Sequence, residues 1–118
     1  MKLIDRSTLQ QKLGRVTLAE ALPEKYWRDW HLPGARHLPH DQVRSLAPSV
    51  LPDKSAEVVV YCASSTCQNS HIAAKLLEQM GYVKVAVYAG GKQDWQEAGL
   101  PVERGAAVAV RAGSARGG

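Results

Sequence analysis

Cys62 and Cys67 are the residues of this chain whose type and spacing could do chemistry. Cys62 directly follows the apolar run VVVY at 58–61, and four residues separate it from Cys67. A thiolate is a nucleophile and a metal ligand, so the pair is compatible with covalent catalysis, a disulfide or a metal site. Cysteine is also often buried as a small apolar residue, so Cys62 could equally be a packing residue at the end of a strand.

The segment ASSTCQNS after Cys62 contains only small and polar residues. Such a segment suits a curled loop that exposes backbone N–H groups, and the start of a following helix adds further N–H groups and the positive end of its dipole. Both would stabilise a thiolate or a bound anion, so we expect a lowered pKa at Cys62. The expected anion-binding loop comprises Ala63, Ser64, Ser65, Thr66, Cys67, Gln68, Asn69 and Ser70.

Two strands and two helices are expected to position this loop. The run EVVVY at 57–61 is typical of a strand buried on both faces. Apolar residues at helical spacing over 70–80, with Gly81 after them, predict a helix. The run VKVAVY at 83–88 predicts a further strand, and a turn at the Gly90-Gly91 pair then leads to a short helix over 92–98.

The first half of the chain predicts more alternation of the same kind. We expect a strand in KLID, a helix capped by Ser7 with Gln10 in a capping box, a strand over 16–22, a helix over 24–30 and a helical connector broken by Pro48 and Pro52. Alternating strands and helices indicate an α/β fold, a single domain with a mostly parallel sheet of about five strands flanked by helices. We place the domain at 1–103 and a flexible Gly- and Ala-rich tail at 104–118.

Composition and charge favour a globular protein over a membrane or nucleic-acid-binding protein. The 118 residues fit one domain, and 45% hydrophobic with 22% charged residues is typical of globular proteins. No segment has the length and apolarity of a signal peptide or a membrane span, so we expect a cytoplasmic protein without a membrane partner. The net charge of +4 comes from scattered Lys and Arg, which gives no basic stripe for nucleic acid.

Several of these segments together resemble the rhodanese (sulfurtransferase) family. The segments are WHLPGARHLP, then VVVYC, the polar loop, SHIAAKLLEQMGY and VKVAVYAGGKQDWQEAGLPV, in that order over roughly 1–103. The resemblance implies a single-domain member with an extended C-x4-C loop, in which Cys62 takes a sulfane sulfur from thiosulfate or a persulfide donor. The persulfide on Cys62 then passes the sulfur to a thiol or cyanide acceptor, and no metal or other cofactor is required.

Two departures from the family pattern bear on the donor. Seven residues separate Cys62 from Ser70, and no Arg or Lys occurs between Cys62 and Ala74. The family's Asp-Val-Arg near the first core strand appears here as Glu20-Ala21-Leu22. Without these cations a persulfide donor competes with thiosulfate as the expected substrate. We expect Glu20 to support the loop from beneath by hydrogen bonding.

Several alternatives remain open at the level of sequence. Cys67 could attack the persulfide, carry sulfur itself, or be an inert loop residue. A phosphatase or arsenate reductase on the same fold would need a loop arginine, which is missing. A zinc site built from Cys62, Cys67 and His71 would lack an evident fourth ligand. The remaining rival is a protein-interaction or redox and sulfur-sensing module with weak or no turnover.

Overall fold

The computed structural model describes residues 1–105 and contains one five-stranded sheet. Its strands are β1 (Lys2–Ile4), β2 (Thr17–Glu20), β3 (Arg36–His37), β4 (Glu57–Tyr61) and β5 (Lys84–Tyr88). The strands lie in the order β1-β5-β4-β2-β3, and every neighbouring pair is parallel. The expected α/β fold with a parallel sheet of about five strands is confirmed.

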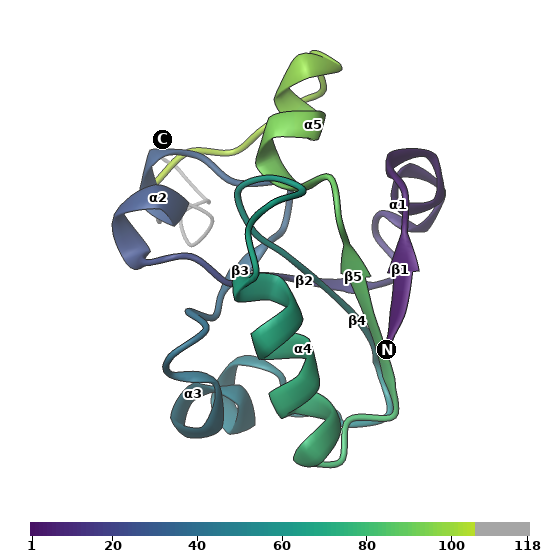
Figure 1. Ribbon diagram of the computed structural model, residues 1–118, viewed down its shortest axis with the longest axis vertical. Helices are drawn as coiled ribbons and strands as arrows, with labels where there is room; N and C mark the ends of the chain where they lie inside the picture. The colour runs from purple at the N-terminus through teal and green to yellow at the C-terminus, as the bar shows by residue number, and fades with distance from the viewer. Residues whose placement is uncertain (106–118) are drawn as a thin grey trace.

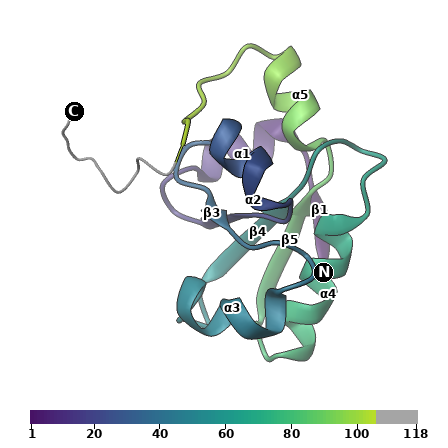
Figure 2. The same ribbon diagram turned by 90° about the vertical axis from the view of Figure 1, so that its left-hand side faces the viewer.

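Helices cover both faces of this sheet. They are α1 (Arg6–Lys12), α2 (Glu24–Asp29), α3 (Val43–Val50), α4 (Asn69–Gln79) and α5 (Gly91–Glu97). Figures 1 and 2 show α3 and α4 on one side of the sheet and α1, α2 and α5 on the other. The central strands β4 and β5 are therefore enclosed, which explains why their sequences are apolar almost throughout.

The core is divided into two clusters because side chains alternate along each strand. On β4, Val58 and Val60 pack with residues of α3 and α4, such as Ala47 and Leu77. Val59 and Tyr61 lie on the other face of the sheet, with Trp95 of α5 among their neighbours. This alternation decides which face each residue near the carboxyl end of β4 can reach.

Two details of the helices differ from the sequence-based expectations. The cap of α1 is Asp5, whose carboxylate accepts the N–H of Thr8, so the expected Ser7 capping box is wrong. Pro48 lies inside α3 rather than breaking it. Burial of Val43 and Ala47 and a hydrogen bond from the Tyr82 hydroxyl to the Leu51 carbonyl hold this helix despite the proline.

The end of the described chain packs against α2. The Arg104 side chain donates to the carbonyl of Asp29, and the N–H of Gly105 donates to the carbonyl of Arg28. Beyond these two residues, the tail expected at 104–118 lies outside the described residues. Within the described chain, no helix has the length and apolarity needed to cross a membrane.

Candidate functional site

Cys62 lies immediately after the carboxyl end of β4, on the face of the sheet that α4 covers. Its side chain is almost fully buried, with 1% of the residue exposed. Its sulfur lies 3.4 Å from the backbone carbonyl oxygen of Cys67 and 3.3 Å from the hydroxyl oxygen of Ser70, within hydrogen-bond reach of both. The sulfur is thus held between the loop and the first turn of α4.

The loop after Cys62 is curled by a few local hydrogen bonds. The N–H of Cys67 donates to the carbonyl of Ser64 at 3.1 Å, and the hydroxyls of Ser64 and Thr66 are also 3.1 Å apart. Helix α4 begins at Asn69, one residue before the expected start. The two loop cysteines are both free thiols.

Helix α5 anchors the beginning of the loop. The N–H groups of Lys92 and Gln93 donate to the carbonyls of Cys62 and Ala63, at 2.9 and 2.8 Å. In Figure 1 the connection from β4 accordingly passes beside the start of α5. Gly91 has φ +67°, and a Cβ there would lie 2.5 Å from the carbonyl oxygen of Cys62, so the close approach requires glycine. The Gly90-Gly91 pair predicts only a turn from the sequence, and it is the feature that marks this close approach.

The backbone N–H groups of the loop divide between two sulfurs instead of converging on one. Those of Ala63 and Asn69 donate to Cys67, whereas the N–H and hydroxyl of Ser70 act on Cys62. The side chains of Ser65, Thr66 and Gln68 are exposed. The N–H groups of three residues within the expected 63–70 loop therefore contact sulfur.

The pKa values of the two thiols are shifted in opposite directions. Burial raises the pKa of Cys62, and the contacts from Ser70 offset this only in part. The expected lowering at Cys62 is therefore wrong, because the loss of hydration outweighs the hydrogen bonds. Burial also disfavours the Cys67 thiolate, but hydrogen bonds from the Cys62 thiol and from the N–H groups of Ala63 and Asn69 lower the pKa of Cys67 overall.

Glu20 lies on the opposite face of the sheet from Cys62. Its carboxylate accepts the hydroxyl of Tyr61 at 2.8 Å and pairs with the Lys92 ammonium at 3.1 Å. Because Tyr61 and Cys62 are consecutive, their side chains point to opposite faces. The carboxylate therefore does not hydrogen-bond to the loop, and the expected contact from beneath is replaced by an indirect connection through Tyr61 and Lys92.

Lys92 is a buried cation that the sequence did not single out. Its ammonium donates to the carbonyl of Tyr26 at 2.8 Å and lies 4.6 Å from the ring centroid of Trp30. Burial lowers the pKa of Lys92, and the Glu20 carboxylate opposes that shift. In the hydrogen bonds and ion pairs of residues 1–105, no Lys or Arg side chain contacts the Cys62–Ser70 loop.

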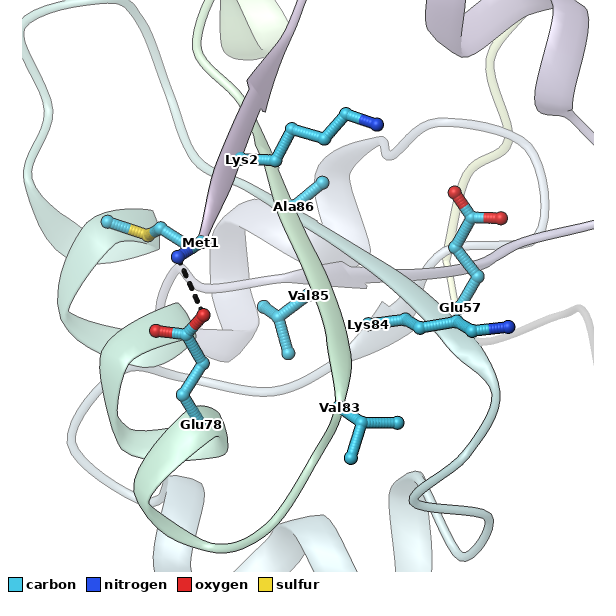
Figure 3. A pocket seen from close by; sticks show the side chains of 8 residues that line it. All are labelled: Met1, Lys2, Glu57, Glu78, Val83, Lys84, Val85 and Ala86. Atoms are coloured by element: carbon cyan, nitrogen blue, oxygen red, sulfur yellow. Dashed lines mark ion pairs between the residues drawn. The ribbon is translucent and has the colours of Figure 1, made fainter.

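A separate groove lies at the other end of the sheet, where β1, β4 and β5 begin. Figure 3 shows its lining and the ion pair between the Met1 amino group and the Glu78 carboxylate, at 2.6 Å. The groove is lined by Met1, Lys2, Glu57, Glu78, Val83, Lys84, Val85 and Ala86. Its charges are mixed, and none of these lining residues is a cysteine, serine or histidine. We therefore place the candidate site at the Cys62 loop.

The side chains suggested as zinc ligands do not form a metal site. Over residues 1–105, no group of three or more His, Cys, Asp or Glu is arranged to hold a metal ion. The Cys62 sulfur instead contacts the Cys67 carbonyl and the Ser70 hydroxyl. The arrangement is that of a thiol pair with backbone N–H donors, suited to sulfur chemistry that passes through a cysteine.

Comparisons with known proteins identify the family of the chain. Residues 5–98 match the rhodanese-like domain family. The chain is 28% identical over 99 residues to the HTH-type transcriptional regulator Rv0324 of Mycobacterium tuberculosis, covering 84% of this chain and 42% of that protein. It is 36% identical over 73 residues to the thiosulfate sulfurtransferase PspE of Escherichia coli, covering 62% of this chain and 66% of that protein. This chain therefore spans less than two thirds of either relative.

Solved structures give the same result. The rhodanese-like domain of the Anabaena protein Alr3790 superposes with a TM-score of 0.78 at 26% identity, covering 88% of this chain and 80% of that one. The thiosulfate sulfurtransferase from Pseudomonas aeruginosa has a TM-score of 0.76 at 22% identity, covering 89% of this chain and 20% of that one; at this identity the match shows the fold alone. With the family match over most of its length, this chain belongs to the rhodanese-like domain family.

Proposed function

We propose that this domain transfers a sulfane sulfur through a persulfide on Cys62. The observation that carries the proposal is the position of Cys62, at the carboxyl end of β4 and against the first turn of α4, in a chain of the rhodanese-like family. This is the edge of a parallel sheet at which α/β proteins place their sites. The similarity to a protein named thiosulfate sulfurtransferase supports the same reaction class.

The reaction has two displacements. The Cys62 thiolate attacks the sulfane sulfur of the donor, a new S–S bond forms, and the donor's remaining part leaves with the bonding electrons as sulfite or a thiolate. An acceptor thiol or cyanide then attacks the outer sulfur and releases the Cys62 thiolate. The Ser70 N–H and hydroxyl, which stabilise negative charge on Cys62, act in both steps.

Among residues 1–105, no Lys or Arg side chain hydrogen-bonds to or forms an ion pair with the loop, and this favours a persulfide donor over thiosulfate. Thiosulfate and its product sulfite are both dianions, which a guanidinium or ammonium would normally neutralise. The buried Lys92 ammonium forms an ion pair with Glu20 on the other face of the sheet. A thiol persulfide leaves as a monoanionic thiolate and depends less on such a cation. A tetrahedral oxyanion such as phosphate would also need a cation at the loop, so we do not propose a phosphatase.

Intact mass measurement tests the proposal. The reduced protein is incubated with thiosulfate or glutathione persulfide and weighed, with Cys62→Ser as the test variant and Ser65→Ala, at an exposed loop position, as the control. We expect sulfur uptake by the wild type and the control, visible as an added sulfur or as its released product, and none by Cys62→Ser. Uptake that persists in Cys62→Ser would contradict the proposal.

A sulfur- or redox-sensing module is the second candidate function. It is favoured by the burial and raised pKa of Cys62, which slow attack on a donor, and by the similarity to a protein named as a transcriptional regulator. The two functions differ in turnover. Modification of Cys62 without catalytic transfer to a thiol or cyanide acceptor would select the sensor over the transferase.

A further inference from the structure

Cys67 lies in the same loop as Cys62, and its carbonyl is 3.4 Å from the Cys62 sulfur. The N–H groups of Ala63 and Asn69 and the thiol of Cys62 favour negative charge on the Cys67 sulfur and lower the pKa of that thiol. Cys67 is half-buried, whereas Cys62 is 1% exposed, so Cys67 is the more accessible thiol of the two. A second thiol therefore belongs to the residue whose carbonyl contacts the sulfur that we assign as the nucleophile.

The backbone of Cys67 is fixed on both sides. Its carbonyl accepts the Cys62 thiol at 3.4 Å, and its N–H donates to the Ser64 carbonyl at 3.1 Å. These contacts hold the Cys67 backbone beside the Cys62 sulfur. Because the loop holds this position while both thiols are reduced, the two cysteines are already neighbours when the reaction begins.

We propose that Cys67 resolves the persulfide on Cys62, and this inference rests on the proposed function because that persulfide is its substrate. The Cys67 sulfur attacks the inner sulfur, Cys62 Sγ, and the bond from Cys62 Sγ to the outer sulfur breaks. The outer sulfur leaves as hydrosulfide with the proton given up by Cys67. The product is a Cys62–Cys67 disulfide, and the two thiols have supplied the two electrons that reduce the sulfane sulfur.

The hydrogen bonds in the loop favour this direction of attack. Thiolates are the attacking species in thiol–disulfide exchange, and the donors around Cys67 lower its pKa. A further turnover requires that a thiol or dithiol reductant restore both thiols. The site would thus release hydrosulfide and depend on reductant, rather than hold a persulfide for a distant acceptor.

A single-turnover experiment tests the inference. The fully reduced chain, freed of reductant and kept without oxygen, is mixed with one equivalent of thiosulfate or of glutathione persulfide, and intact mass and hydrosulfide are followed. We expect the wild type to lose two hydrogen atoms and release one hydrosulfide per chain. Cys67→Ser should instead retain one added sulfur and release none. Ser45→Ala, at an exposed position of α3 outside the site, should behave as the wild type.

The outcomes separate this inference from the proposed function. A persulfide that is equally long-lived in the wild type and in Cys67→Ser overturns the resolving role and leaves the transferase intact. A disulfide that forms equally fast without donor also overturns it. Failure of every variant to take up sulfur from either donor overturns both proposals. Cys67→Ala, checked by circular dichroism, replaces Cys67→Ser if that variant does not fold.

Discussion

Tyr61 and Cys62 are neighbours in the chain, yet they belong to two polar sites on opposite faces of the sheet. On one face, Tyr61, Glu20 and Lys92 form a buried network in which opposite charges are paired. On the other face, the Cys62 loop contains thiols, hydroxyls and backbone N–H groups, and within residues 1–105 no Lys or Arg side chain contacts it. We infer that the paired charges stabilise the core, whereas the thiols of the other face remain available to react.

The largest expected effect comes from breaking the charged cluster alone. Lys92→Met leaves the Glu20 carboxylate buried without its cation, which should lower the free energy of unfolding by about 3–5 kcal/mol. Urea unfolding measures the loss. Sulfur uptake by the folded fraction should be unchanged, because the Lys92 side chain points away from Cys62 while its backbone N–H still holds the Cys62 carbonyl.

The double variant Glu20→Gln/Lys92→Met serves as the matched control for that prediction. It removes both charges while a glutamine oxygen can still accept the Tyr61 hydroxyl, so we expect it to regain at least half of the lost stability. Arg28→Met, which removes an exposed ion pair with Glu24, should cost less than about 1 kcal/mol. Equal losses from Lys92→Met and Arg28→Met would contradict the assignment of the cluster to the core.

A substitution at Gly91 should damage both sites, because this residue lies where the loop meets α5. Gly91→Ala places a Cβ 2.5 Å from the Cys62 carbonyl oxygen at a positive φ. We expect a loss of about 2–4 kcal/mol in the free energy of unfolding. We also expect sulfur uptake to slow by about tenfold to a hundredfold as Cys62 is displaced.

Gly99→Ala is the control that tests the cost of a positive φ without a steric contact of the new Cβ. Gly99 also has positive φ, at +69°, but a Cβ there would have no atom within 4 Å. Gly99→Ala should lower the free energy of unfolding by about 1 kcal/mol and leave sulfur uptake normal. If Gly91→Ala and Gly99→Ala behave alike, the close contact between α5 and the loop has no energetic importance.

Alkylation should distinguish the two thiols on the uncharged face. Iodoacetamide reacts with thiolates, so at neutral pH Cys67, with its lowered pKa and greater exposure, should be labelled several times faster than Cys62. Because the pKa of Cys62 is raised, its labelling should continue to increase with pH after that of Cys67 has levelled off. Peptide mass analysis after timed labelling measures both rates; faster labelling of Cys62 would reverse this assignment.

Ser70→Ala should have the smallest effect and should be confined to the Cys62 face. The Ser70 hydroxyl stabilises the Cys62 thiolate, so its removal should raise the pKa of Cys62 further. At neutral pH, sulfur uptake should fall about threefold to tenfold, corresponding to the loss of one hydrogen bond worth roughly 1 kcal/mol. The deficit should diminish at higher pH, where the thiolate forms regardless, and Ser65→Ala should show neither change.

Much of the fold could be predicted because local patterns and tertiary packing agree. The valines before Cys62 and the spacing of apolar residues over 70–80 require a buried strand and an amphipathic helix in almost any α/β arrangement. The helix details failed where tertiary contacts override local preference. Pro48 stays helical because neighbouring side chains bury into the core, and Asp5 replaces Ser7 as cap because β1 ends at Ile4.

The candidate site was less predictable than the fold. Cys62, Cys67 and Ser70 were chosen from their type and order, and the structure brings all three together. Lys92 gave no signal, because a lysine near the start of a short helix normally lies in solvent. The indirect role of Glu20 could not be predicted from the sequence either, since it depends on the face of β2 on which the side chain lies.

By itself, the sequence determined that a cysteine ends the central strand, that a small polar loop follows it, and that this loop contains a second cysteine without Lys or Arg. Only the tertiary structure decided how the N–H groups are shared between the sulfurs, how deeply Cys62 is buried, and where the one buried lysine points. The physical reason is that hydration and hydrogen bonding of a thiol depend on atoms brought together from β4, α4 and α5. Because these elements are far apart in the sequence, the sequence pattern does not reveal which of their atoms meet.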